Sequence, residues 1–158
     1  GPLHVMETLT FMMGEFEAEF PVDRLYAKNH MWALRTNTGT RFGFSAYAVR
    51  LLQDVYFLDW YFDAPASVRF QQEIGSIESK KAESSLYAPL NGELSRFNPA
   101  LLADPSGINV DKYDSGWLFE IIESDDNEES LMTAEAYLEH LTKVWEVTQR
   151  TIKGQMNG

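Results

Sequence analysis

The alternation of apolar and polar positions predicts a chain made mostly of short β-strands. Alternating, β-branched or aromatic stretches occur at residues 9–20, 25–34, 39–44, 55–62 and 116–122. An offset at Gly14 interrupts the first of these stretches, and we interpret it as a β-bulge within one strand. The turn-rich residues 36–39 predict a hairpin between the strands on either side. The pattern therefore favours a mainly β fold.

The middle of the chain predicts a strand, an exposed turn and a second strand. Apolar residues occur through 67–77 and return at 86–90, whereas the stretch between them, residues 78–84, is polar and charged. Asn91-Gly92 follows immediately. Because both central residues of a type I′ turn need a positive φ, this pair predicts a further hairpin.

Two short helices interrupt the strands. Ser45 is a suitable N-cap for a helix at 46–53. Asn98 followed by Pro99 has the composition of a helix start and predicts a second short helix at 99–103.

The last third of the chain predicts an acidic linker and then a longer helix. Residues 124–130 lack the alternating ligands and the central glycine of a calcium loop, so we interpret them as a solvated linker. Thr133 then predicts the N-cap of a helix that runs to about residue 153. Its apolar stripe predicts packing against the β core, with a partner or dimer face as the alternative.

Composition limits the functions that the chain can serve. Its 158 residues suit one domain, and 24 Asp and Glu against 13 Lys and Arg give a net charge of -11, which disfavours nucleic-acid and membrane-surface roles. The apolar runs are too short to span a bilayer. Residues 1–5 look like the remnant of a protease site used in protein expression, and no signal peptide follows, so we expect a cytoplasmic protein formed by residues 6–158.

Side chains that could carry catalysis are few. The chain has no cysteine, so any redox chemistry needs an attached group, and its three histidines are too scattered for a metal site. Ser45 lacks the second glycine of a nucleophile elbow. No glycine-rich phosphate motif is present, so we expect a protein that is not an enzyme. The lysine pair Lys80-Lys81 in the polar turn remains, either as ordinary surface charge or as a modification site.

The context of this pair favours modification. Residues 75–92 resemble the lipoyl-attachment hairpin of the glycine cleavage system H protein, which reads approximately G-x-x-E-S-V-K-A-A-S-x-x-Y-A-P-V-S-G. In this alignment Lys81 takes the place of the lipoyl-bearing lysine, and Lys80 stands where valine is usual. A biotin carrier would have methionine on both sides of its lysine.

Further similarity to the family runs collinearly from about residue 25 to residue 141. It includes a Y-T-x-x-H-E-W-like strand entry, a G-I-T-x-Y-A-Q-x-x-L-G-D-I-V-F-V-like segment, an N-x-x-x-Y-x-x-G-W-L segment and an L-x-x-A-x-x-Y helix start. These lie at 26–32, at 43–58, at Asn109 to Leu118, and at 131–137.

The resemblance implies a barrel-sandwich hybrid fold of two small antiparallel sheets, with short helices, a C-terminal helix at about 133–153 and Lys81 at a hairpin tip. It implies a lipoyl carrier that moves an aminomethyl group and reducing equivalents among glycine decarboxylase, aminomethyltransferase and dihydrolipoyl dehydrogenase. A lipoate ligase or transferase would attach lipoate to Lys81, and Glu78, Ser79 and Ala82 would form part of what that enzyme recognises.

Several positions depart from the family pattern. Met31 replaces a glutamate, Gln53 a glycine, residues 70–72 a glycine turn, and Glu120 a lysine. Two alternatives therefore stay open: an H-like lipoyl carrier of another pathway, such as sulfur oxidation or lipoate relay, and an interaction module without lipoate.

Overall fold

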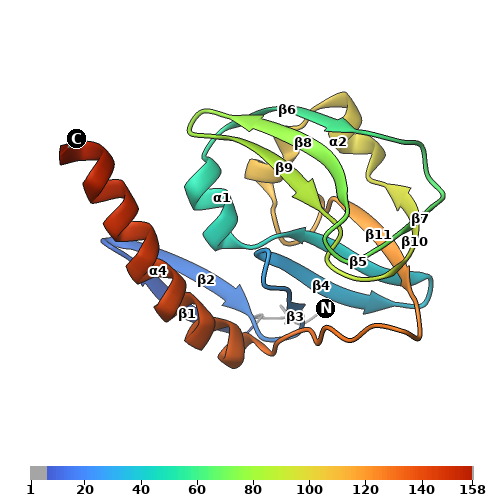
Figure 1. Ribbon diagram of the computed structural model, residues 1–158, viewed down its shortest axis with the longest axis horizontal. Coiled ribbons are helices and arrows are strands. Elements are labelled where there is room, and N and C mark those ends of the chain that lie inside the picture. Colours follow the sequence, from blue (N-terminus) through green and yellow to red (C-terminus); the bar gives the residue numbers. More distant parts are fainter. Residues whose placement is uncertain (1–6, 158) are drawn as a thin grey trace, which may run out of the picture.

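The computed structural model describes the backbone of residues 7–157 and the side chains of residues 7–150 (Figure 1). The expected remnant at residues 1–5 lies outside the described part. The strands are β1 (Thr8–Met13), β2 (Phe16–Pro21), β3 (Leu25–Tyr26), β4 (Met31–Thr36), β5 (Gly39–Phe44), β6 (Val55–Trp60), β7 (Ala66–Val68), β8 (Glu73–Ser79), β9 (Glu83–Tyr87), β10 (Gly92–Phe97) and β11 (Phe119–Glu123). The helices are α1 (Ala46–Leu52), α2 (Pro99–Ala103), α3 (Gly107–Val110) and α4 (Ala134–Asn157).

The strands form three antiparallel sheets. Six of them make a sheet in the order β3-β4-β5-β11-β10-β7, and three make a sheet in the order β6-β8-β9. Within residues 7–157, β1 pairs only with β2. The six- and three-stranded sheets enclose one apolar core, which includes Phe42, Ile77 and Leu94. The mainly β, barrel-sandwich architecture implied by the family resemblance is confirmed, but the third sheet, formed by β1 and β2, was not expected.

The local hairpins were predicted with mixed success. The turn at 36–39 does join β4 to β5, and Thr36 pairs with Gly39. The bulge expected at Gly14 is wrong, because residues 9–20 form two strands, β1 and β2, with a turn between Met13 and Phe16. Gly14 has a φ of +66°, a conformation that glycine adopts without a steric penalty.

The hairpin predicted at Asn91-Gly92 is also wrong. β9 pairs with β8 in one sheet, whereas β10 lies between β11 and β7 in the other, so residues 88–91 cross from sheet to sheet. Neither Asn91 nor Gly92 has a positive φ. Instead, the Asn91 Oδ1 accepts a hydrogen bond from the Phe70 N–H at 2.6 Å, and Gly92 leaves room for the Ile122 backbone of β11.

The helices lie close to their predicted positions. α2 covers the expected residues, and the Asn98 side chain accepts the Ala100 N–H at its start. Thr133 caps α4 by accepting the Ala136 N–H at 3.2 Å. Ser45 occupies the N-cap position of α1, but its hydroxyl makes no capping bond and contacts the Tyr137 hydroxyl at 2.9 Å instead. Helix α3 was not predicted.

A second apolar cluster joins the two ends of the described chain. β1, β2 and α4 lie side by side at one edge of the sandwich (Figure 1). Buried residues of this layer include Met13, Phe20, Tyr137 and Leu141, and they pack with Tyr47 of α1. The apolar stripe of α4 therefore covers the β structure, as predicted, rather than standing free.

A buried polar chain ties α4 to the sandwich. The Tyr137 hydroxyl hydrogen-bonds to both the His30 Nδ1 at 2.8 Å and the Ser45 Oγ at 2.9 Å, and its ring stacks on Tyr26 with centroids 4.7 Å apart. Burial, followed by the nearby His140, lowers the pKa of His30 from 6.5 to about 4. His30 is therefore neutral at physiological pH.

Candidate functional site

The β8–β9 hairpin ends in a tight turn at the predicted modification site. The Ser79 N–H donates to the Ala82 carbonyl at 2.9 Å, the Ser79 hydroxyl donates to the same carbonyl at 3.1 Å, and the Ala82 N–H reaches the Ser79 Oγ at 3.2 Å. Ser79 is buried. Lys80 and Lys81 are the two residues that the closed turn leaves at the tip.

Both lysines extend into solvent. Lys80 and Lys81 are exposed, and within residues 7–150 no carboxylate forms an ion pair with either ammonium group. Glu78 and Glu83 face each other across the ladder just below the tip. Their negative charge lies beside the lysines, but it leaves both amines available to an external reactant.

The tip is also held from below by the segment that follows α1. The Lys80 N–H donates to the Asp54 carbonyl at 2.8 Å, and the Lys81 N–H donates to the Leu52 carbonyl at 3.3 Å. The residue between these carbonyls, Gln53, has a φ of 59° and a ψ of -142°. The turn is thus hydrogen-bonded both within itself and to the body of the sandwich.

A side chain far along the sequence holds this segment in turn. The Asn109 Nδ2 donates to the Gln53 carbonyl at 2.7 Å, and its Oδ1 accepts the Val55 N–H at 2.9 Å. Sequence reasoning placed Asn109 in a family motif but gave it no role. Nothing local in the sequence signals these contacts, because the residues they join lie 54 and 56 positions apart.

Comparison with known proteins identifies the family. A family model described as glycine cleavage H-protein matches residues 24–144. The chain belongs to the glycine cleavage H-protein family. The matched range contains the Lys81 turn, the segment beneath it and Asn109, whereas β1, β2 and the end of α4 lie outside it.

Individual members of the H-protein family are similar over most of their length. The chain is 41% identical over 119 residues to the glycine cleavage system H protein of Synechococcus sp. (strain CC9605), covering 75% of this chain and 92% of that protein. It is 39% identical to that of Citrobacter koseri, covering 74% and 92%. A crystal structure of a glycine cleavage system H protein from Mycobacterium marinum superposes with a TM-score of 0.68 at 29% identity, covering 77% of this chain and 98% of that one.

Two departures from the H-protein pattern fall at unusual backbone conformations. Gln53, which replaces a glycine of the family pattern, has a φ of 59°, and Gln71, in the stretch that replaces a glycine turn, has a φ of 67°. Residues with a β-carbon seldom adopt a positive φ, so both positions have a backbone conformation that favours glycine.

A third departure, Glu120, is matched by two arginines. Glu120 is buried, and its carboxylate lies 2.9 Å from both Arg41 and Arg96, whose guanidinium groups lie over the Trp117 ring. Hydrogen bonds from Arg96 are the main reason that the pKa of Glu120 falls below its usual value. The buried carboxylate is therefore charged and paired at neutral pH.

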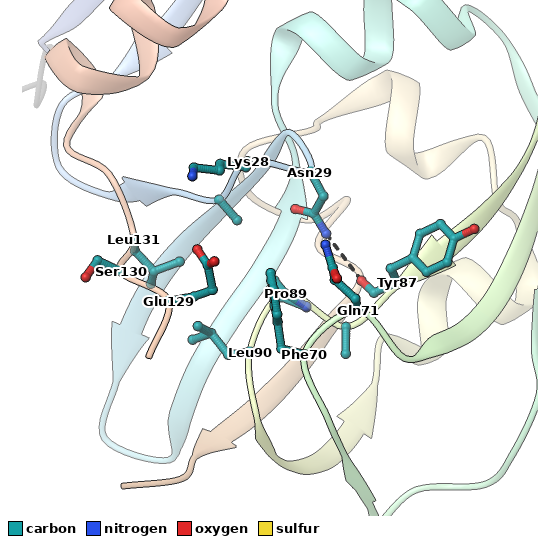
Figure 2. Close-up of a pocket in the computed structure, with 12 residues that line it drawn as sticks. Lys28, Asn29, Phe70, Gln71, Tyr87, Pro89, Leu90, Glu129, Ser130 and Leu131 are labelled. Atoms are coloured by element: carbon teal, nitrogen blue, oxygen red, sulfur yellow. Dashed lines mark hydrogen bonds between the residues drawn. The ribbon is translucent and has the colours of Figure 1, made fainter. Parts of the chain in front are cut away.

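Two concave sites open near the hairpin. A cleft of about 340 Å³ begins at Ala82, next to Lys81, and is lined mainly by apolar side chains such as Leu51, Leu52 and Leu86. A larger pocket of about 610 Å³ lies where four loops meet, residues 27–29, 70–71, 87–90 and 129–131 (Figure 2).

The two concave sites share Asn29 and Tyr87. Figure 2 shows the Asn29 side chain directed toward Tyr87, whose carbonyl accepts the Asn29 Nδ2 at 3.2 Å. The Asn29 Oδ1 is buried without a hydrogen-bond partner among the described residues. The wall between the cleft and the larger pocket therefore contains an unused acceptor.

The structure brings all four predicted site residues to one hairpin. Lys81 is exposed at the tip, Ser79 and Ala82 close the turn, and Glu78 ends the β8 ladder opposite Glu83. Because Ser79 is buried with its hydroxyl bonded within the turn, its contact with an external enzyme would be indirect, through the turn's shape.

Proposed function

We propose that this chain is the lipoyl carrier of a glycine cleavage system and that Lys81 is the attachment site. The observation that carries the proposal is an exposed lysine, without an ion pair among the described side chains, at the tip of a doubly anchored turn. The relatives of this chain are glycine cleavage system H proteins. Attachment needs a free primary amine in a fixed orientation, and the turn supplies both.

Attachment forms one amide bond. The Lys81 Nζ attacks the activated carboxyl carbon of lipoate, the bond from that carbon to adenylate breaks, and the amine loses a proton. Once bound, lipoate supplies the disulfide that accepts an aminomethyl group and is later re-formed by oxidation, chemistry that a chain without cysteine cannot perform alone. The apolar cleft that begins at Ala82 suits the alkyl part of such an arm.

The chain's own residues would orient the arm and carry no catalytic step. Glycine decarboxylase, aminomethyltransferase and dihydrolipoyl dehydrogenase are the proposed partners, and they would supply the catalysis. The net charge of -11 is a proposed docking feature, so transfer rates should fall as salt rises. The cytoplasmic location stays a prediction, and no helix among the described residues is long and apolar enough to cross a bilayer.

Intact-mass measurement after incubation with lipoate, ATP and a lipoate–protein ligase tests the attachment site. We expect one lipoyl group on the wild type and on Lys80→Arg, and none on Lys81→Arg. An unmodified wild type, or equal modification of Lys81→Arg, would contradict the proposal.

A second assay separates the glycine cleavage role from another lipoyl pathway. The lipoylated wild type is mixed with glycine decarboxylase and glycine, and carbon dioxide release is measured against a lipoylated bacterial H protein. Release within about tenfold of that reference supports the proposal, whereas none above the unmodified chain would favour an H-like carrier of a different pathway.

A further inference from the structure

Two adjacent lysines at one turn create a problem of selection. Lys80 and Lys81 are both exposed, so exposure alone does not determine which amine reacts. They differ in how their backbone is held, because the Lys80 N–H bonds to Asp54 and the Lys81 N–H bonds to Leu52.

We propose that Asn109 is a positioning residue for lipoylation. It holds residues 52–55 in the shape that fixes the turn above them, and so presents Lys81, rather than Lys80, to the attaching enzyme. This inference rests on the proposed function of the turn and adds to it the group that determines which lysine is modified.

The path from Asn109 to the lysines contains only hydrogen bonds to the backbone. Asn109 bonds to Gln53 on one side and to Val55 on the other, at 2.7 and 2.9 Å. The carbonyls of Leu52 and Asp54 lie within the same stretch and receive the two lysine N–H groups. A shift of this stretch therefore moves the acceptors of both lysines.

The segment needs this support because its central conformation is unfavourable. Gln53, with a φ of 59° and a ψ of -142°, lies in a region that residues with a β-carbon rarely occupy. Such a conformation persists only where the surroundings enforce it. Asn109 donates to the carbonyl of Gln53 itself and accepts the N–H of Val55, so it fixes the backbone that leaves this residue.

Asn109 is itself rigidly placed. It lies in α3, whose Ile108 is fully buried in the sandwich core, and its own N–H bonds to the Ser106 carbonyl at 2.9 Å. The lysine turn is thus anchored to the core through α3 as well as through the β8–β9 ladder.

Asn127 provides a matched control. Like Asn109, it is a partly buried asparagine whose Oδ1 accepts a backbone N–H, that of Asn91 at 2.7 Å, and whose Nδ2 donates to carbonyls, those of Asn91 and Ser124. Its bonds reach none of residues 52–55. Asn127→Ala therefore removes a similar set of hydrogen bonds elsewhere in the fold.

The experiment measures which lysine is modified. Wild type, Asn109→Ala, Asn109→Asp and Asn127→Ala are incubated with lipoate, ATP and a lipoate–protein ligase, and tandem mass spectrometry of the tip peptide gives the ratio of lipoyl-Lys81 to lipoyl-Lys80. We expect that ratio to fall about tenfold in Asn109→Ala, which loses both side-chain hydrogen bonds to the segment, and to stay unchanged in Asn127→Ala. Amide hydrogen exchange at Lys80 and Lys81 should accelerate in the Asn109 variants alone.

Each result has one interpretation. An unchanged ratio and unchanged exchange in the Asn109 variants, or an equal change in Asn127→Ala, would overturn the role of Asn109 while leaving Lys81 as the attachment site. A wild type that the ligase does not modify overturns the proposed function, and exchange at the two amides then still decides whether Asn109 holds the turn. If Asn109→Ala does not fold, Asn109→Asp, which keeps the acceptor and loses the donor, gives the same comparison.

Discussion

The buried His30 should make folding stability depend on pH in a way that one substitution removes. Its folded pKa of about 4 lies below its usual 6.5, chiefly because of burial. Above pH 6.5 the His30 side chain is neutral in both the folded and the unfolded chain, so protonation of His30 does not lower the free energy of unfolding there. Between pH 6.5 and about 4 the unfolded chain binds a proton that the folded chain does not, so stability falls as the pH falls.

The size of the effect follows from the pKa difference. Each unit corresponds to about 1.4 kcal/mol, so the full shift corresponds to about 3 kcal/mol. Lowering the pH from about 7.5 to about 5 should then reduce the free energy of unfolding by about 2 kcal/mol through His30 alone. This range stays above the pI near 4.6, where solubility is lowest.

Urea unfolding of wild type and His30→Asn at the two pH values measures the effect. Asparagine suits the backbone here, because His30 has a φ of 69° and asparagine tolerates that region. The variant should lose about 2 kcal/mol less than the wild type over this pH range. His140→Asn, which removes the neighbouring ring 6.2 Å away, is the control and should retain most of the slope. Equal pH dependence in wild type and His30→Asn would refute the reasoning.

Three further predictions concern stability. Gln53→Gly should raise the free energy of unfolding by about 1 kcal/mol, because glycine adopts a positive φ without strain. The midpoint of thermal unfolding should then rise by roughly 2–4 °C, whereas Gln53→Ala should give no increase. Gly92→Ala should lower stability in urea by more than about 3 kcal/mol, because its methyl group would clash with the Ile122 carbonyl oxygen of β11. Gly14→Ala, with open space around it but a positive φ, should cost only about 1 kcal/mol, and similar losses in the two variants would contradict this. Glu120→Gln should cost about 2 kcal/mol in the same assay because it leaves two arginines without their carboxylate, and an equal effect of the exposed Glu93→Gln would argue against the pairing.

How far the sequence predicts this fold depends on the distance between interacting residues. The β4–β5 turn and the start of α2 were predicted correctly because their signals are local, at residues 36–39 and at Asn98. The Asn91-Gly92 signal was misleading because β10 pairs with β11 and β7, and a two-residue turn signal carries no information about strands that are distant in the sequence. The Ser45 hydroxyl likewise makes no capping bond, because it hydrogen-bonds to the Tyr137 hydroxyl, 92 residues away.

The candidate site also has one part that the sequence predicts and one part that it does not. Family resemblance pointed to Lys81, and the hairpin that carries it joins neighbouring strands. The acceptors beneath it, at Leu52 and Asp54, lie at the end of α1 and just after it, and the Asn109 side chain that holds this segment comes from α3. A pattern read along the chain gives no sign of contacts between a side chain and a distant backbone carbonyl.

The order in which these parts occur along the chain has a consequence for synthesis. Residues 55–87, which form the whole three-stranded sheet and the lysine turn, leave the ribosome before Asn109 and before β11, the strand that joins the two halves of the six-stranded sheet. A nascent chain therefore carries both lysines on a hairpin whose supporting segment, residues 52–55, is not yet held by Asn109. Since domains complete their folding only when their last elements emerge, the turn acquires its final geometry late in translation. An attaching enzyme that depends on that geometry would act on the finished protein and pass over the growing chain.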